Sequence, residues 1–290
     1  MQAELLETTG ADQKEKAELF QRLHAGPPIL VLPNAWDAAS ARVLEAHSGC
    51  LAIGTSSAGI AAALGFADGE RLSRGEMLAA VSRIARAVAV PVSADVEAGY
   101  GSTPSEAAET ARGVLAAGAV GLNLEDGVPG TQAVLVEPSL QAEKIAAMRE
   151  VAKRAGIPLV VNARTDVYWL QIGDAEARLS EAVTRARIYL GAGADCIFVP
   201  GVSDGGTIEV LSREIPAPLN VLATAGTPPV RELERLGVAR VSVGSGFMRA
   251  ALRRLQEMAR ELLDEGTYAA FSDDTIPYPE LARLLDRLDS

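Results

Sequence analysis

The chain has 290 residues, of which 48% are hydrophobic, so it is long enough to bury a large core as one domain or as two small ones. Its 27 basic and 38 acidic residues give a net charge of −11, and the basic residues are scattered along the chain. This composition argues against a nucleic-acid-binding protein and against a protein held on an anionic membrane by a basic patch.

The two cysteines, Cys50 and Cys196, are far apart and do not form a disulfide framework, so we expect small core residues in a cytoplasmic protein. The polar, acidic N-terminal segment resembles neither a signal peptide nor a transit peptide. No apolar run reaches the roughly 18 residues that a membrane span needs. We therefore expect no nucleic acid and no membrane among the partners.

Eight short apolar runs follow one another along the chain and predict strands buried on both faces. They lie at 29–32, 50–54, 90–95, 119–124, 157–163, 195–199, 217–222 and 238–243. Amphipathic segments with helical spacing separate them, such as "DAASARVLEAHS" and "TPSEAAETARGVLAAG". Thr103-Pro104 with Glu106 predicts a capped helix start, and Gly118 and Gly193 stand where helices should end.

Strands that alternate with helices predict a parallel sheet, and eight of them are the number that closes a barrel. The alternative is an open doubly wound sheet, which would want a glycine-rich phosphate loop after the first strand. The sequence there is "PNAWDAAS", which has no such loop. We predict an α/β protein with a single (β/α)8 TIM-type barrel over residues 1–290, including a helical N-terminal segment (1–26) and a C-terminal helical tail (266–290).

Polar residues follow the predicted strands at the end where barrels carry their chemistry. Asp95 and Glu97 are two positions apart, so we expect them on one face of a strand, and Glu125 ends the next strand. Clustered carboxylates repel each other unless a cation or protons neutralise them. Hard oxygen ligands favour Mg²⁺ or Mn²⁺ over zinc, and the two histidines, His24 and His47, stand away from these strand ends.

Arg164 offers a planar fork for a carboxylate or a phosphonate, and the small residues of "GTSSAG" (54–59) can bring backbone amides to an anion. With a divalent cation, these groups describe a site for a small anionic oxo acid, whose enolate the metal would stabilise. Each feature also has an ordinary structural interpretation. A strand-end acid can cap a helix, Arg164 can pair with Asp126 or Asp166, and aromatic residues such as Trp36 and Tyr100 can serve packing.

At these residues the sequence resembles the isocitrate lyase / phosphoenolpyruvate mutase superfamily, from about residue 30 to residue 246. "SADVEAGYG" is similar to the family's metal-binding segment, with a glutamate in place of the second aspartate. "GLNLED", "NARTD" and "GTSSAGIAAALGFAD" are similar to three further family segments. The resemblance implies a (β/α)8 barrel and a Mg²⁺ shell of Asp95, Glu97, Glu125 and Asp68, the last mostly through water.

The resemblance also implies that Arg164 and the amides of Ser56, Ser57 and Ala58 hold the substrate anion. We add Trp36, Asn123 and Asn220 to the candidate substrate contacts. Glu125 and Tyr100 are the candidate proton donors or acceptors beside Arg164, with water as a third. A homodimer or homotetramer, in which the last barrel helix swaps between subunits, is implied as well, and "YAAFSDDTIPYPELARLLDRL" is long enough for such a tail.

The chain departs from the family lyases in the segment after Asp126. "GVPGTQAVLVEPSL" (127–140) has no Cys, Lys or His, whereas family lyases carry a catalytic cysteine there, and Pro200 stands where lyases have an acid. The lysine and asparagine expected of a phosphonate mutase are also missing. Three functions stay open: a Mg²⁺-dependent C–C lyase acting on a small 2-oxo or 2-hydroxy di-acid through a pyruvate-like enolate, phosphonomutase-like P–C bond chemistry, and a catalytically silent 2-oxo acid binding protein.

Overall fold

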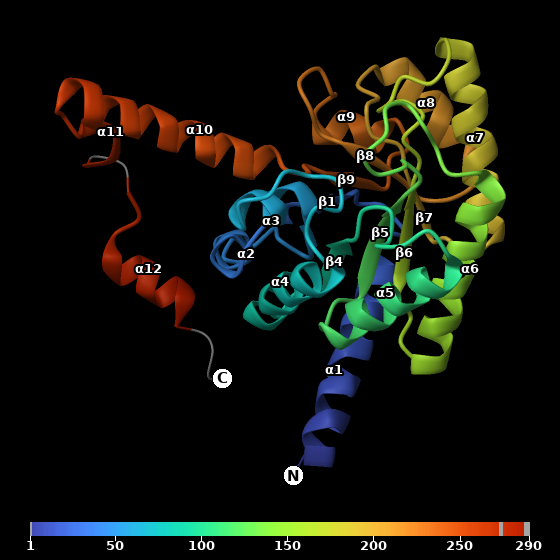
Figure 1. Cartoon of the computed structure of the whole chain (residues 1–290), viewed down its shortest axis with the longest axis horizontal. Coiled ribbons are helices and arrows are strands. Elements are labelled where there is room, and N and C mark those ends of the chain that lie inside the picture. The colour runs from blue at the N-terminus through green and yellow to red at the C-terminus, as the bar shows by residue number, and fades with distance from the viewer. Residues whose placement is uncertain (1, 273–274, 287–290) are drawn as a thin grey trace.

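The computed structural model describes residues 2–272 and 275–286, and Figure 1 shows a barrel of parallel strands surrounded by helices. Its strands pair in the order β1-β9-β8-β7-β6-β5-β4-β3-β2. They are β1 Leu30–Leu32, β2 Asn34–Ala35, β3 Ile53–Thr55, β4 Val92–Asp95, β5 Gly121–Glu125, β6 Val160–Arg164, β7 Cys196–Phe198, β8 Leu219–Leu222 and β9 Arg240–Ser242. Every predicted strand position contains or overlaps one of these, so the (β/α)8 barrel is confirmed.

The ninth strand, β2, was not predicted, because it begins after Pro33, beyond the end of the first predicted strand (29–32). Proline has no N–H to donate to a strand neighbour. Before it, β1 pairs with β9, and after it, β2 pairs with β3. The Pro33 carbonyl still accepts a hydrogen bond of 2.9 Å from the Gly54 amide. One interrupted strand therefore closes the ring.

Helices follow most of the strands and cover the outside of the barrel (Figure 1). They are α1 Gln2–Leu23, α2 Ala38–Glu45, α3 Ser57–Ala63, α4 Arg74–Ala87, α5 Pro104–Ala116, α6 Pro138–Ala155, α7 Ala175–Gly191, α8 Gly205–Glu214, α9 Val230–Arg235, α10 Gly246–Arg260, the π-helical turn η1 Glu261–Glu265, α11 Ala269–Ser272 and α12 Tyr278–Leu285. The predicted capping of α5 is confirmed, since the side chains of Thr103 and Glu106 each accept from the other's backbone N–H. Gly118 and Gly193 follow helices with φ of +91° and +104°.

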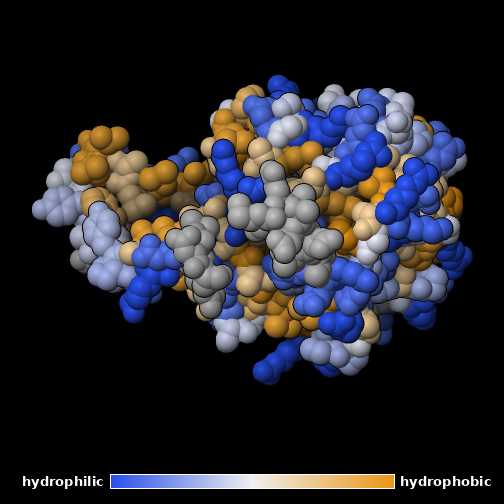
Figure 2. Space-filling model, turned by 90° about the horizontal axis from the view of Figure 1, so that it is seen from below, coloured by the Kyte–Doolittle hydropathy of each residue, from blue (hydrophilic) through white to orange (hydrophobic). Residues whose placement is uncertain are grey.

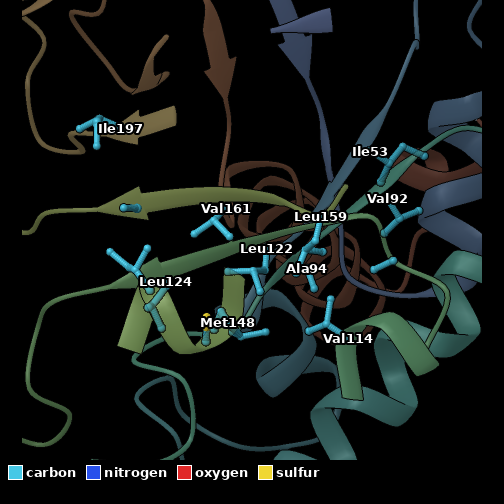
Figure 3. Packing of buried hydrophobic residues seen from close by; sticks show 14 of the residues in the cluster. Ile53, Val92, Ala94, Val114, Leu122, Leu124, Met148, Leu159, Val161 and Ile197 are labelled. Carbon is cyan, nitrogen blue, oxygen red and sulfur yellow. The ribbon is translucent and has the colours of Figure 1, made fainter. Parts of the chain in front are cut away.

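The main core lies between the strands and the outer helices. Figure 3 shows Leu122 and Leu124 of β5 near Met148 of α6, with Val114 of α5 in the same layer. Side chains alternate between the two faces of a strand. Because Leu122 and Leu124 point outward to the helices, the residues on either side of them in β5 point into the barrel. In β4, β5 and β6 those inward positions hold polar side chains: Ser93, Asp95, Asn123, Glu125, Asn162 and Arg164. The barrel interior is thus unusually polar, and this positions the site.

The N-terminal end of the barrel is closed by α1. Phe20 and Ala17 are completely buried, in a second apolar cluster with residues at the start of the strands: Leu30, Leu32, Ala52, Val120 and Val160. A Cβ atom at Gly121 would lie 2.5 Å from the Phe20 ring, so glycine is required at that position. The barrel interior therefore has a closed floor under its polar layers.

Helix α10, with η1 and α11, extends away from the barrel, whereas α12 comes back into contact with α2 (Figure 1). These helices expose large apolar side chains, and Figure 2 shows hydrophobic surface on this projecting arm. Leu255 is 55% exposed and Leu263 is 80% exposed. Residues 273–274 and 287–290 of the predicted tail (266–290), and residue 1 of the predicted N-terminal segment (1–26), lie outside the described residues. In the described part of the chain, no helix is both long enough and apolar enough to span a membrane.

Candidate active site

A cavity of about 230 Å³ opens at the carboxyl ends of the strands. All four carboxylates predicted for the metal shell line it: Asp68, Asp95, Glu97 and Glu125. So do Arg164, Asn123 and the turn Ser56–Ala58. The structure thus brings together residues that are up to 108 positions apart in the chain.

Asp95 organises the turn between β3 and α3. Its Oδ2 accepts hydrogen bonds from both the amide and the hydroxyl of Ser57, at 2.9 and 2.8 Å, and its own amide donates to the Thr55 hydroxyl. The Ser56 amide donates to the Ala35 carbonyl. Two of the three amides predicted to hold an anion are therefore already used. Among the described contacts, the Ala58 amide has no such partner.

Glu97 does not share a strand face with Asp95, because β4 ends at Asp95 and Glu97 has a left-handed φ of +49°. Our expectation about that face was wrong, although both side chains reach the cavity. Glu70 and Tyr100, with φ of +55° each, are left-handed too. Non-glycine residues rarely adopt this conformation, which costs on the order of 1–3 kcal/mol each. Contacts hold the turn: Glu97 accepts from the Glu70 amide (2.5 Å) and the Tyr100 hydroxyl (3.0 Å), and the buried Lys144 donates to the Ala98 carbonyl.

Burial and neighbouring negative charge raise the pKa of Glu97 to about 7. Burial also raises the pKa of Asp68, with a further contribution from Asp95, and raises the pKa of Glu125 well above its usual value. Burial and the Glu97 carboxylate raise the pKa of Tyr100, so its phenol stays protonated. The cavity therefore concentrates negative charge that its own residues do not fully neutralise.

Arg164 is the cation at the mouth of this cavity. Its Nη1 lies 2.7 Å from Glu125, and its Nε lies 2.6 Å from Asp166. Of the two partners that the sequence suggested for Arg164, Asp126 and Asp166, the ion pair forms with Asp166. The rings of Trp169 and Phe198 lie 5.9 and 5.8 Å from the guanidinium carbon. This packing restricts the plane of the guanidinium, and among the described contacts its Nη2 has no hydrogen-bond partner.

Behind the cavity, a buried network positions the segment that follows β6. Asp126 accepts from the Asp166 amide at 2.8 Å, from the Tyr189 hydroxyl at 2.7 Å and from Arg185 at 3.1 Å. Asp126 is completely buried, and all of its partners are donors. It therefore holds Asp166, and through it Arg164, in place.

The donor set fits a hard divalent cation. The described residues contain no group of three or more His, Cys, Asp or Glu side chains close enough to hold an ion together. An ion bound by one or two carboxylates would keep water in its other positions, which is the usual environment of Mg²⁺. Its charge would also offset the burial and the neighbouring carboxylates that together raise the pKa values of Asp68, Glu97 and Glu125.

Three predicted site residues do not line the cavity. Trp36 packs against α3, where a Cβ atom at Gly59 would lie 2.9 Å from the Trp36 Cβ. Tyr100 stands behind Glu97, and Asn220 is buried beside Ser242, whose hydroxyl donates to its Oδ1. The cavity is instead lined by residues that we had not assigned: Asn34, Ser93, Asp166, Trp169, Arg240 and Ser242. An arginine inside the apolar run "VARVSV" was the clearest signal of this set.

The segment after β5 covers one side of the cavity as a short hairpin. Gly127 pairs with Leu135, and Val128 donates to the Val134 carbonyl. Val128, Pro129 and Thr131 line the cavity, and residues 127–140 contain no Cys, Lys or His. This hairpin can exclude water from a ligand, but among its described side chains none is a strong acid or base facing the cavity.

A family model described as phosphoenolpyruvate phosphomutase matches residues 20–263. The chain belongs to this family. The match includes every strand of the barrel and every residue discussed in the cavity. The predicted membership in the isocitrate lyase / phosphoenolpyruvate mutase superfamily is therefore confirmed.

Relatives in the phosphoenolpyruvate phosphomutase family match most of the chain. An uncharacterised protein of Mycobacterium tuberculosis is 38% identical over 264 residues, which cover 91% of this chain and 94% of that protein. The 2-methylisocitrate lyase of Bacillus subtilis is 29% identical, covering 89% of this chain and 85% of its own. A crystal structure from Burkholderia cenocepacia, described as a candidate phosphonomutase, is 42% identical with a TM-score of 0.81, covering 85% of this chain and 99% of that one.

Proposed function

We propose that this protein is a Mg²⁺-dependent lyase that cleaves a carbon–carbon bond of a small 2-oxo or 2-hydroxy di-acid through a pyruvate-like enolate. The observation that carries the proposal is the meeting of Asp68, Asp95, Glu97 and Glu125 with Arg164 around one cavity at the carboxyl end of the barrel. The similarity to a 2-methylisocitrate lyase supports the same class of reaction. Mn²⁺ is an alternative ion with the same preference for oxygen ligands.

The bound ion would act as a Lewis acid that stabilises negative charge on the substrate's oxygen. We assign Asp95 and Glu97 to hold it, with Glu125 and Asp68 acting directly or through water. Arg164 orients the substrate anion with Nη2, and the free amide of Ala58 is the second donor for it. The hairpin at 127–137 excludes water.

Glu125 is the residue that we propose for proton transfer. Burial raises the pKa of its carboxyl well above the usual value, which suits a group that exchanges a proton, and it lines the cavity beside Arg164. Tyr100 is the less suitable candidate, because its hydroxyl donates to Glu97 and it does not line the cavity. We assign Tyr100 to positioning Glu97.

The test is a thermal-shift titration with Mg²⁺ and oxaloacetate, oxalate, 2-oxoglutarate, methylisocitrate and phosphonopyruvate, followed by assays of pyruvate and CO₂ release. We expect a Mg²⁺-dependent shift with product release that Glu125→Gln removes. The matched control is Asp174→Asn, which changes an acid that caps α7 outside the cavity. Turnover that is independent of Mg²⁺, or unaffected by Glu125→Gln, would contradict the proposed mechanism.

Two other functions rest on specific observations. Phosphonomutase-like chemistry is favoured by the similarity to the Burkholderia cenocepacia structure, and it predicts turnover of phosphonopyruvate alone. A silent 2-oxo acid binding protein is favoured by the lack of Cys, Lys and His in 127–140. It predicts tight binding without any product, and in that case the lyase proposal fails.

We also propose that the chain forms a homodimer or homotetramer, in which the helices after β9 pack on another copy. The exposed Leu255, Leu262 and Leu263 on the projecting arm support this assembly. Light scattering after size exclusion should give a multiple of the 30.2 kDa chain mass. Leu255→Glu should shift the protein toward the monomer, whereas Leu64→Glu, on the exposed end of α3, should not.

A further inference from the structure

Two arginines line the cavity, and they differ in their partners. Arg164 is committed to Glu125 and Asp166. Among the contacts of the described residues, Arg240 has no hydrogen bond or ion pair to a carboxylate, and the charge of Asp95 reaches it only at longer range. Its Nη1 lies 3.4 Å from the Nε2 of His24. Arg240 is therefore the cation in the cavity that has no anion assigned to it.

The groups in direct contact with Arg240 are uncharged, and Asp95 acts on its charge from across the cavity. Its guanidinium carbon lies 5.9 Å from the face of Phe20, which belongs to the floor of the barrel. His24 donates through Nδ1 to the Phe20 carbonyl at 2.7 Å, so Nε2 is free to accept from Arg240. This acceptor carries no charge while the imidazole is neutral. A cation that is 2% exposed thus stands over an aromatic ring and a neutral imidazole.

Two buried donors converge beside the cavity without acceptors. The Nε of Arg240 has no partner, and neither has the Nδ2 of Asn220. These residues are direct neighbours across the β8–β9 ladder. The Oδ1 of Asn220 is occupied by the Ser242 hydroxyl at 3.3 Å, and Ser242 also lines the cavity. Buried donors in native proteins nearly always have an acceptor, so this pair points to an oxygen-bearing group of a ligand.

We propose that Arg240 anchors an anion subsite at the floor of the cavity, which takes one carboxylate of a small di-acid whose other end reaches the carboxylate-rich mouth. A carboxylate fits because its two oxygens can accept from a guanidinium and from a neighbouring donor at once. The subsite rests on the proposed function only in using the same cavity. It explains why a di-acid, rather than a simple 2-oxo acid, is the substrate class.

The test is a binding cycle that separates the two ends of the ligand. Calorimetry in the presence of Mg²⁺ measures the affinity of malonate and of its monomethyl ester for the wild type and for Arg240→Met. We expect the wild type to prefer the dianion by about tenfold or more, and Arg240→Met to lose most of that preference. Arg240→Lys should retain part of it. Arg42→Met is the matched control, because Arg42 is also buried (6% exposed) but lies on α2, outside the cavity.

The outcomes separate the subsite from the proposed reaction. A preference for malonate that depends on Arg240 supports the subsite even if no substrate is turned over. An unchanged preference in Arg240→Met overturns it, even if the enzyme is active. The subsite is also overturned if the wild type binds none of oxalate, malonate and succinate. The same holds if the wild type binds sulfate as tightly as malonate, because the site would then not select a carboxylate. If Arg240→Met does not fold, a crystal structure of the wild type with malonate decides whether a carboxylate contacts Arg240.

Discussion

His24 makes the stability of the barrel depend on pH in a way that can be calculated. The imidazole is 5% exposed, and its Nε2 faces the guanidinium of Arg240. Burial, followed by the positive charge of Arg240, lowers its pKa from 6.5 to about 4. A protonated His24 would place a second positive charge against Arg240, so the folded state strongly favours the neutral ring.

The sign follows from the two pKa values. The unfolded chain binds a proton at His24 below about pH 6.5, whereas the folded chain does not until about pH 4. Stability is therefore full above pH 6.5 and falls as the pH decreases to about 4. The shift corresponds to about 3 kcal/mol in total, of which about 2 kcal/mol is lost at pH 5.

Urea unfolding of the wild type and His24→Gln at pH 7 and pH 5 measures this contribution. The wild type should lose about 2 kcal/mol more than His24→Gln between the two pH values. His47→Gln, which changes the exposed second histidine, should behave like the wild type. Equal losses in wild type and His24→Gln would refute the reasoning. An NMR titration of the wild type that gives His24 a pKa near 6.5 would refute it without any variant.

Three further perturbations test the site. Asp126→Asn should destabilise the protein by about 3 kcal/mol in urea unfolding, because Arg185 loses a buried anionic partner; a loss below 1 kcal/mol would show that the network is dispensable. Asp95→Asn should weaken Mg²⁺ binding at least tenfold, as measured by calorimetry. Asp204→Asn, at the exposed cap of α8, should leave the affinity unchanged. An unchanged Mg²⁺ affinity in Asp95→Asn would remove Asp95 from the proposed metal shell. Cys50→Ser and Cys196→Ser should retain any activity that the wild type shows, and a selective catalytic loss in a stably folded variant would mean that a thiol takes part in the chemistry.

The fold could be predicted from the sequence because its signals are local. Every apolar run became part of a strand, and Thr103 with Glu106 marked the start of α5 correctly. Strand β2 was missed, although Pro33 was visible, because the consequence depends on which neighbours β1 and β2 find. Those neighbours are set by the closure of the ring and not by adjacent residues.

The membership of the cavity was harder to predict than its location. The four acids and Arg164 follow strand ends and could be placed at the rim from chain order alone. Trp36 and Tyr100 follow strand ends as well, yet they point elsewhere because the turns that carry them are fixed by Ser40 and by Glu70. The hydrogen bond from the Ser57 amide to Asp95 joins residues that are 38 positions apart in the chain. Side-chain directions of this kind arise only when the turns are packed together.

The closed floor of the barrel has a kinetic consequence. Because α1 seals the amino-terminal end with Phe20 and Ala17, a ligand must enter and leave through the carboxyl-end mouth. Cleavage of a substrate there would produce two fragments, one nearer the mouth of the cavity and one nearer its floor. The fragment nearer the mouth has to depart first, and the inner one can follow only afterwards. If the proposed cleavage takes place, the closed floor would order product release, so that the inner product competes directly with substrate and the outer one does not.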